Sequence, residues 1–146
     1  MFHGMNGGFT LFECLVVLAI VGIGIALGMP ALQLHRDRWA VTQAREASAA
    51  LLARARIDAL GSGASQVTIV PGRGHIERSL AGTFRERVDL GDRYGVSLDI
   101  SGRDTLATIE FNALGLGRMA ARTLRFGRGA THASLVISTY GRVSRR

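Results

Sequence analysis

Apolar and polar residues follow three successive patterns along this 146-residue chain. The first is a continuous apolar run, because no Asp, Glu or Arg occurs among the twenty-one residues from 14 to 34. At about 1.5 Å per residue, a helix of that length spans roughly 30 Å, the thickness of the hydrocarbon layer of a bilayer. We therefore predict a transmembrane helix over residues 9–34, with one acid, Glu13, inside its leading edge.

In the second pattern, over residues 35–60, apolar and small residues recur at steps of three and four. They share one helical face, which consists of Val41, Ala44, Ser48, Leu51, Leu52, Ala55 and Ala59. The sequence Gly61-Ser62-Gly63 predicts the end of this segment. The two segments together predict one helix of about fifty residues with a kink at Pro30, because proline removes one helical hydrogen bond and crowds the preceding turn.

The third pattern has a period of two and covers residues 61–146. Seven short alternating segments, mostly separated by Gly and Pro, predict strands; they begin at Gln66, Gly74, Thr83, Tyr94, Thr105, Arg122 and Ser134. Strands at this spacing predict an antiparallel sheet with one face covered, and the amphipathic half of the helix is the available cover. The predicted fold class is α+β, with a long N-terminal helix packed on a C-terminal antiparallel β-sheet domain.

Charge is distributed unevenly along the chain. The net charge is +7, all eighteen basic residues are Arg, and residues 1–110 contain eleven Arg and all eleven acids. Residues 111–146 contain seven Arg and no acid. This asymmetry favours a polyanionic or acidic partner for the C-terminal quarter of the chain.

Arginines flank the last predicted strand on both sides, at Arg122, Arg125, Arg128, Arg142, Arg145 and Arg146. A hairpin that brought three to six of them together would form a basic patch able to bind DNA phosphates without reading sequence. Two alternatives remain open from composition alone. The terminus is solvated and frayed, or the patch contacts acidic lipid or an acidic neighbouring protein.

No pattern in the sequence indicates an enzyme. The lone Cys14 excludes an intramolecular disulfide, and the four His lack the spacing of metal ligands. Gly115–Ala120 matches G-x-G-x-x-A, but no acid follows Glu110, so we predict a loop between two strands and not a nucleotide site. A Gly-x-Ser-x-Gly nucleophile elbow is absent. We expect no metal, no cofactor and no small-molecule substrate.

Glu13 needs an explanation, since a charged side chain costs about 2.5–3.5 kcal/mol near the centre of a membrane-spanning helix and less near its end. One interpretation is that cleavage between Gly8 and Phe9 creates a free amino group, and that Glu13 pairs with this amine on a neighbouring copy. The other is that Glu13 lies at the interface, just outside the bilayer. The residues by themselves leave both interpretations open.

The N-terminal sequence GGFTLFE, followed by an apolar helix, resembles the class III signal of type IV pilins and type II secretion pseudopilins. The resemblance implies that residues 1–8 are a leader that prepilin peptidase removes after Gly8. It also implies that Phe9 becomes N-methylated and that Glu13 helps to dock the subunit in a filament. Pro30 falls where pilins often have a helix-kinking proline. The leader is short and lacks a basic residue, and Phe12 replaces a more typical small or polar residue.

Three later stretches resemble the GspH/FimT group of minor pilins and pseudopilins. They are LLARARIDAL with its following strand, IEFNALG, and the Tyr-Gly-Arg-Val near the C-terminus. This resemblance covers most of the chain. It implies the pilin fold, other pilin subunits as partners, and a single-pass anchor in the bacterial inner membrane with a periplasmic C-terminal domain.

FimT-like members of this group have a Gly-Arg-x-Arg tail that is implicated in DNA binding during natural transformation. Gly141, Arg142 and Arg145 approximate this tail, with one extra residue before the second arginine. We therefore expect a FimT-like minor pilin that binds double-stranded DNA, and the residues expected to contact it are Arg125, Arg128, Arg142, Arg145 and Arg146. The alternative is a GspH-like minor pseudopilin of the type II secretion system with a purely structural role.

Overall fold

The computed structural model describes residues 10–102, 105–118 and 121–146. The chain divides into two compact units, residues 1–35 and residues 36–146, which we describe separately. The single long helix expected from the sequence is confirmed as α1 (Leu11–Ser62), 52 residues in length. Its first part makes up the described portion of unit 1, and its second part belongs to unit 2.

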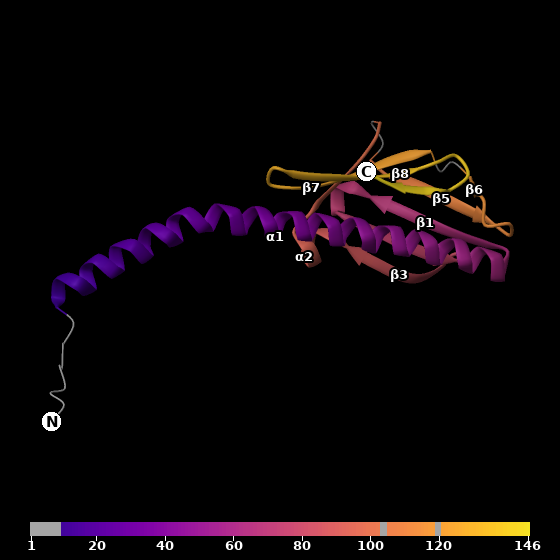
Figure 1. The fold of residues 1–146 in the computed structure, drawn as a ribbon. Helices are drawn as coiled ribbons and strands as arrows, with labels where there is room; N and C mark the ends of the chain where they lie inside the picture. Colours follow the sequence, from indigo (N-terminus) through magenta and orange to yellow (C-terminus); the bar gives the residue numbers. More distant parts are fainter. Residues whose placement is uncertain (1–9, 103–104, 119–120) are drawn as a thin grey trace, which may run out of the picture. The chain divides into compact units, whose positions relative to one another are not determined.

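Unit 2 contains two antiparallel sheets (Figure 1). The five-stranded sheet has the order β3-β2-β1-β5-β6. Its strands are β1 (Ala64–Val70), β2 (His75–Leu80), β3 (Thr83–Asp89), β5 (Ala107–Asn112) and β6 (Gly117–Arg118). The four-stranded sheet has the order β4-β7-β8-β9. Its strands are β4 (Ser97–Ile100), β7 (Arg122–Arg128), β8 (Thr131–Ile137) and β9 (Val143–Arg145).

The sequence pattern predicted the antiparallel strands but not their division into two sheets. It also missed the short strands β6 and β9, whose two and three residues are too few to show a period. Two further short elements are η1 (Pro71–Arg73) and α2 (Leu90–Tyr94). Tyr94 was expected to begin a strand, but it ends α2. Asp89 caps the start of that helix by accepting from the Asp92 N–H at 3.0 Å, and Gly95 ends it with a left-handed φ of +62°.

All seven residues of the predicted helix face are buried. The six apolar residues of this face form one hydrophobic core with inward-facing residues of both sheets, among them Ile69 and Ile109 of the five-stranded sheet and Leu124 and Leu135 of the four-stranded sheet. Figure 1 shows the second half of α1 running alongside the strands of unit 2. Burial of each large aliphatic side chain contributes about 1.5–3 kcal/mol, so this face fixes the helix on the sheets.

Polar contacts also join α1 to the five-stranded sheet. Ser65 Oγ donates to the carbonyl oxygen of Ala55 at 2.5 Å. Arg54 donates to both carboxylate oxygens of Glu86, at 2.7 and 3.0 Å. A further arginine on β2, Arg78, forms an ion pair with Asp58 of α1. These contacts set the register of α1 against β1, β2 and β3.

Candidate functional site

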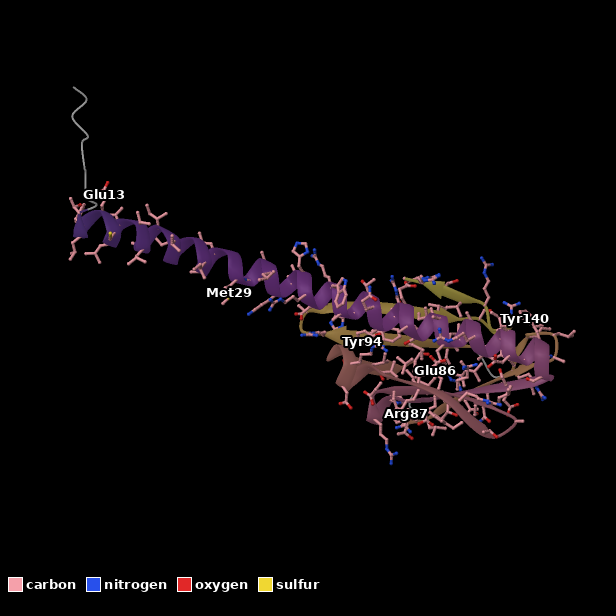
Figure 2. The ribbon with its side chains drawn as sticks, turned by 90° about the horizontal axis from the view of Figure 1, so that it is seen from below. Glu13, Met29, Glu86, Arg87, Tyr94 and Tyr140 are labelled. Carbon is pink, nitrogen blue, oxygen red and sulfur yellow. The ribbon has the colours of Figure 1, made fainter. Side chains whose placement is uncertain are left out.

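The two regions singled out by the sequence are the N-terminal segment and the arginine-rich C-terminus. Gly8 and Phe9 lie outside the described residues, so their cleavage and methylation stay predictions. The described chain begins at Thr10, and Glu13 lies exposed in the first turn of α1 (Figure 2).

Thr10 and Glu13 bond to each other reciprocally at the start of α1. The backbone N–H of Glu13 donates to Thr10 Oγ1 at 3.2 Å, and the backbone N–H of Thr10 donates to Glu13 Oε2 at 3.4 Å. This is a capping box, which satisfies two backbone donors that have no partner within the helix. Its Thr-x-x-Glu signature is present in the sequence, and the sequence analysis did not use it.

The capping box gives Glu13 a local role that is compatible with docking. A carboxylate near a helix N-terminus is stabilised by about 0.3–1 kcal/mol through the helix dipole. Only one oxygen of Glu13 takes part in the capping box, and Oε1 has no hydrogen bond among the described residues. The exposed carboxylate therefore still has an oxygen that can accept from an external amine.

The rest of α1 in unit 1 has an apolar surface that nothing in the described chain covers. An 18-residue window of this helix has a mean hydropathy of 2.5 and is 0% buried, so α1 is long and apolar enough to cross a membrane. Leu18 and Ile23, for example, are 67% and 62% exposed. An apolar surface of this extent indicates a lipid or protein environment. Pro30 lies inside this part of the helix, and its kink stays a prediction.

At the C-terminus, β8 and β9 are joined by a turn that includes Tyr140 and Gly141. The Gly141 N–H donates to the Ser138 carbonyl at 2.9 Å, and the Ser138 N–H donates to the Arg142 carbonyl at 2.8 Å. The turn is also tied to the five-stranded sheet, since the Gly117 N–H of β6 donates to the Tyr140 carbonyl at 3.2 Å. The predicted C-terminal tail is thus an ordered strand and turn.

Two of the arginines expected to contact DNA lie on the α1 side of the four-stranded sheet. Arg128 Nε lies 2.8 Å from Asp37 Oδ1, and its Nη1 donates to the Tyr94 carbonyl at 2.5 Å. Arg145 Nε donates to both carboxylate oxygens of Glu46, at 2.9 and 3.0 Å. Acids of α1 therefore compensate the charge of these two residues.

Arg125 and Arg146 lie on the opposite, outer face of the same sheet. Arg125 is exposed between the buried side chains of Leu124 and Phe126, as the alternation along a strand requires. It pairs across the strands with Ser134, which exchanges backbone hydrogen bonds of 2.8 and 2.9 Å with Arg146. The single basic patch expected from the sequence is therefore divided between two faces.

The Gly115 segment, which matched a nucleotide-binding pattern, is a turn between β5 and β6. Asn112 Oδ1 accepts from the backbone N–H groups of Leu114 and Leu116, both at 3.0 Å. Met119 and Ala120, the end of the pattern, lie outside the described residues. In the ranges that the structure covers, no group of three or more His, Cys, Asp or Glu is placed to hold a metal ion.

Comparison with known proteins bears on the N-terminal segment and on the fold. Residues 4–29 match the family described as the prokaryotic N-terminal methylation motif. This match includes Gly8, Phe9 and Glu13, the residues on which the pilin resemblance depends. The searched curated proteins contain no match to the chain.

Two solved structures that resemble the chain are crystal forms of the type IV minor pilin FimU of Pseudomonas aeruginosa strain PAO1. The form in space group P21 is 17% identical with a TM-score of 0.59, over 73% of this chain and 87% of FimU. The form in P65 is 19% identical with a TM-score of 0.56, over 72% and 91%. At these identities the likeness shows the fold. The chain is type IV pilin-like in both fold and N-terminal motif, and the predicted fold class is confirmed.

Proposed function

We propose that this chain is a minor subunit of a type IV filament. It is anchored in the inner membrane through α1, has residues 36–146 on the periplasmic side, and assembles through the same helix. The observation that carries the proposal is the uncovered apolar part of α1, which follows a methylation motif and has one carboxylate in its first turn. The capping box does not require a charge, because Gln can serve in the same position, whereas a helix that leaves the bilayer to join its copies can pair the charged group with an amino terminus.

The assembly role of Glu13 is tested with Glu13→Gln in cells that build the filament. Glutamine keeps an acceptor for the Thr10 N–H, so the helix start is preserved and the charge is removed. We expect the variant to remain in the inner membrane at the wild-type level but to be depleted at least about tenfold in sheared filaments, the loss expected for a charge-assisted hydrogen bond. Equal amounts of both proteins in filaments would contradict the docking role.

The processing step is tested separately by intact-mass spectrometry of the membrane-bound chain. The expected species begins at Phe9 and carries one methyl group. A chain that still begins at Met1 would contradict cleavage after Gly8.

DNA binding is a second candidate function, favoured by the outer face of the four-stranded sheet. Arg125 and Arg146 are exposed there, and Arg142 is exposed at the turn that precedes β9. None of these three guanidinium groups forms an ion pair with an acid in the described parts of the chain. Arg128 and Arg145, in contrast, already contact carboxylates of α1. We propose that duplex DNA binds the outer face through its phosphates.

Two matched double variants of the detergent-solubilised full chain test this proposal by titration of a labelled duplex across a salt series. Arg125→Gln/Arg146→Gln removes the outer-face charges, and Arg128→Gln/Arg145→Gln removes the charges on the α1 side. We expect only the first to weaken binding and to reduce the slope of log K against log salt by about 2, since each phosphate contact contributes about 0.9. Weak and equal binding by all three proteins would favour the alternative, a GspH-like pseudopilin with a purely structural role.

A further inference from the structure

A groove of about 270 Å³ separates the C-terminal half of α1 from the turn between β8 and β9. Its floor on the helix side is made of Ala49, Leu52 and Ala53. The small alanine side chains leave space that a larger residue would fill. Arg142 and Arg145 line it on the strand side, and Arg56 lines it on the helix side.

The three arginines of the groove differ in how their charge is compensated. Arg145 bonds to both carboxylate oxygens of Glu46. Arg56 and Arg142 are exposed, and neither guanidinium has a carboxylate partner within the described residues. Nearby Arg54, on the same helix as Arg56, is by contrast fully engaged with Glu86. The groove therefore has two uncompensated guanidinium groups.

Three exposed apolar residues belong to the segments that line the groove or pack beside it: Leu60 lies one helical turn after Arg56, Tyr140 precedes Gly141, and Leu114 precedes Gly115. Gly115 packs against the helix, since a Cβ built on it would lie 3.1 Å from Arg56 Cγ and 3.3 Å from Leu60 Cδ2. Leu60, Leu114 and Tyr140 are 57%, 71% and 71% exposed. Figure 2 shows Tyr140 at the end of unit 2 where α1 finishes. We call Leu60, Leu114 and Tyr140 the apolar rim, because their positions in the chain place them near the basic groove.

We propose that this groove binds a carboxylate side chain from an acidic and aliphatic segment of a partner protein. Arg56 and Arg142 provide the charge-assisted hydrogen bonds, which a guanidinium makes with a carboxylate in a bidentate arrangement. The alanine floor accepts the methylene stem of the acid, and the apolar rim buries a neighbouring aliphatic residue.

A protein segment fits this site better than duplex DNA does. The volume of the groove, about 270 Å³, suits one or two side chains. The rim of Leu60, Leu114 and Tyr140 is apolar, whereas protein–DNA interfaces are strongly polar and basic. The inference goes beyond the filament role and rests on the groove alone. Of the three arginines named for DNA binding, only Arg142 lines the groove, whereas the DNA test removes Arg125 and Arg146.

The test measures fluorescence anisotropy of a short labelled peptide of alternating Leu and Glu, titrated with the detergent-solubilised full chain. A peptide of alternating Leu and Gln is the matched probe, and it corrects for partition of apolar residues into micelles. The protein variants are Arg56→Gln/Arg142→Gln and, as control, Arg85→Gln, an exposed arginine of β3 that does not line the groove.

We expect the Glu peptide to bind the wild type at least about tenfold more tightly than the Gln peptide, the difference that a charge-assisted pair supplies. The double variant should lose this preference and Arg85→Gln should retain it. Near-UV circular dichroism checks that each variant keeps the wild-type fold. Equal affinity for the two peptides, or an unchanged affinity in the double variant, would overturn the proposal. The proposal would also be overturned if neither peptide bound and the double variant had a lower affinity than the wild type for duplex DNA.

Discussion

At Gly141 the backbone has a φ of +78°, and a Cβ on this residue would lie 2.7 Å from Phe111 Cε1. It would also lie 3.1 Å from the backbone nitrogen of Gly117. The Gly-Arg pair of the C-terminal turn, which the sequence analysis interpreted only through family resemblance, therefore has a packing reason. Gly141 lets the turn approach the end of the five-stranded sheet, and Arg142 follows at a fixed position.

Replacement of Gly141 by alanine should destabilise unit 2 by about 2–5 kcal/mol, because left-handed backbone costs about 1–2 kcal/mol and overpacking adds about 1–3 kcal/mol. Gly82→Ala is the matched control, since Gly82 has a φ of +76° with nothing within 4 Å of a built Cβ. That variant should show only the backbone cost, about 1–2 kcal/mol. Urea unfolding followed by circular dichroism measures both. Equal losses would show that the contact with Phe111 is unimportant.

At the scale of elements, α1 has two kinds of surface in unit 2. Leu51 is completely buried in the core, whereas Leu60 is 57% exposed on the same helix. The period of three to four residues placed Leu51 on the inner face correctly. The same period does not predict the groove beside Ala49 and Ala53, because the groove depends on where the turn between β8 and β9 lies.

This difference predicts unequal effects of the same substitution at two positions of α1. Leu51→Ala should lower the free energy of unfolding by about 2–5 kcal/mol, since it removes buried surface and leaves a cavity. Leu60→Ala should change it by about 0.5 kcal/mol or less, as for most surface positions. Chemical denaturation of the two variants gives the comparison. A loss at Leu60 as large as that at Leu51 would contradict the assignment of the buried face.

Strand β9 shows why sequence periodicity was insufficient for the C-terminus. Its three residues acquire strand geometry through pairing with β8, in the register Leu135 with Arg145 and Ile137 with Val143. That register, and not the local sequence, directs Arg145 to the α1 side and Arg146 to the outer face. Arg145 then bonds to Glu46, a residue 99 positions earlier in the chain, while Arg146 has no carboxylate partner among the described residues.

At the scale of the whole molecule, the two units divide the apolar residues between two environments. Every buried apolar residue of the described chain belongs to unit 2, while the apolar side chains of residues 10–35 in unit 1 are exposed. The stability of unit 2 and the affinity of unit 1 for a membrane should therefore be separable by mutation.

The same substitution at two isoleucines of α1 tests whether membrane affinity and stability are separable. Ile23 is 62% exposed in unit 1, and Ile57 is 66% exposed in unit 2. Ile23→Arg should reduce the membrane-inserted fraction, because arginine in place of isoleucine near the centre of a span costs about 3–4 kcal/mol. Ile57→Arg should insert normally. Carbonate extraction of membranes measures insertion, and far-UV circular dichroism checks that unit 2 stays folded in both. Identical extraction of the two variants would contradict a membrane role for unit 1.

The sequence by itself determined the apolar segment, the buried face of α1 and most of the strands, since each depends on a period that neighbouring residues establish. It also contained the capping box of Thr10 and Glu13, a signal confined to one helical turn. Only the tertiary structure decided that the strands form two sheets, that the arginines are divided between two faces, and that Arg56 and Arg142 share a groove. These features depend on strand register and on contacts between distant segments, which local periodicity does not encode.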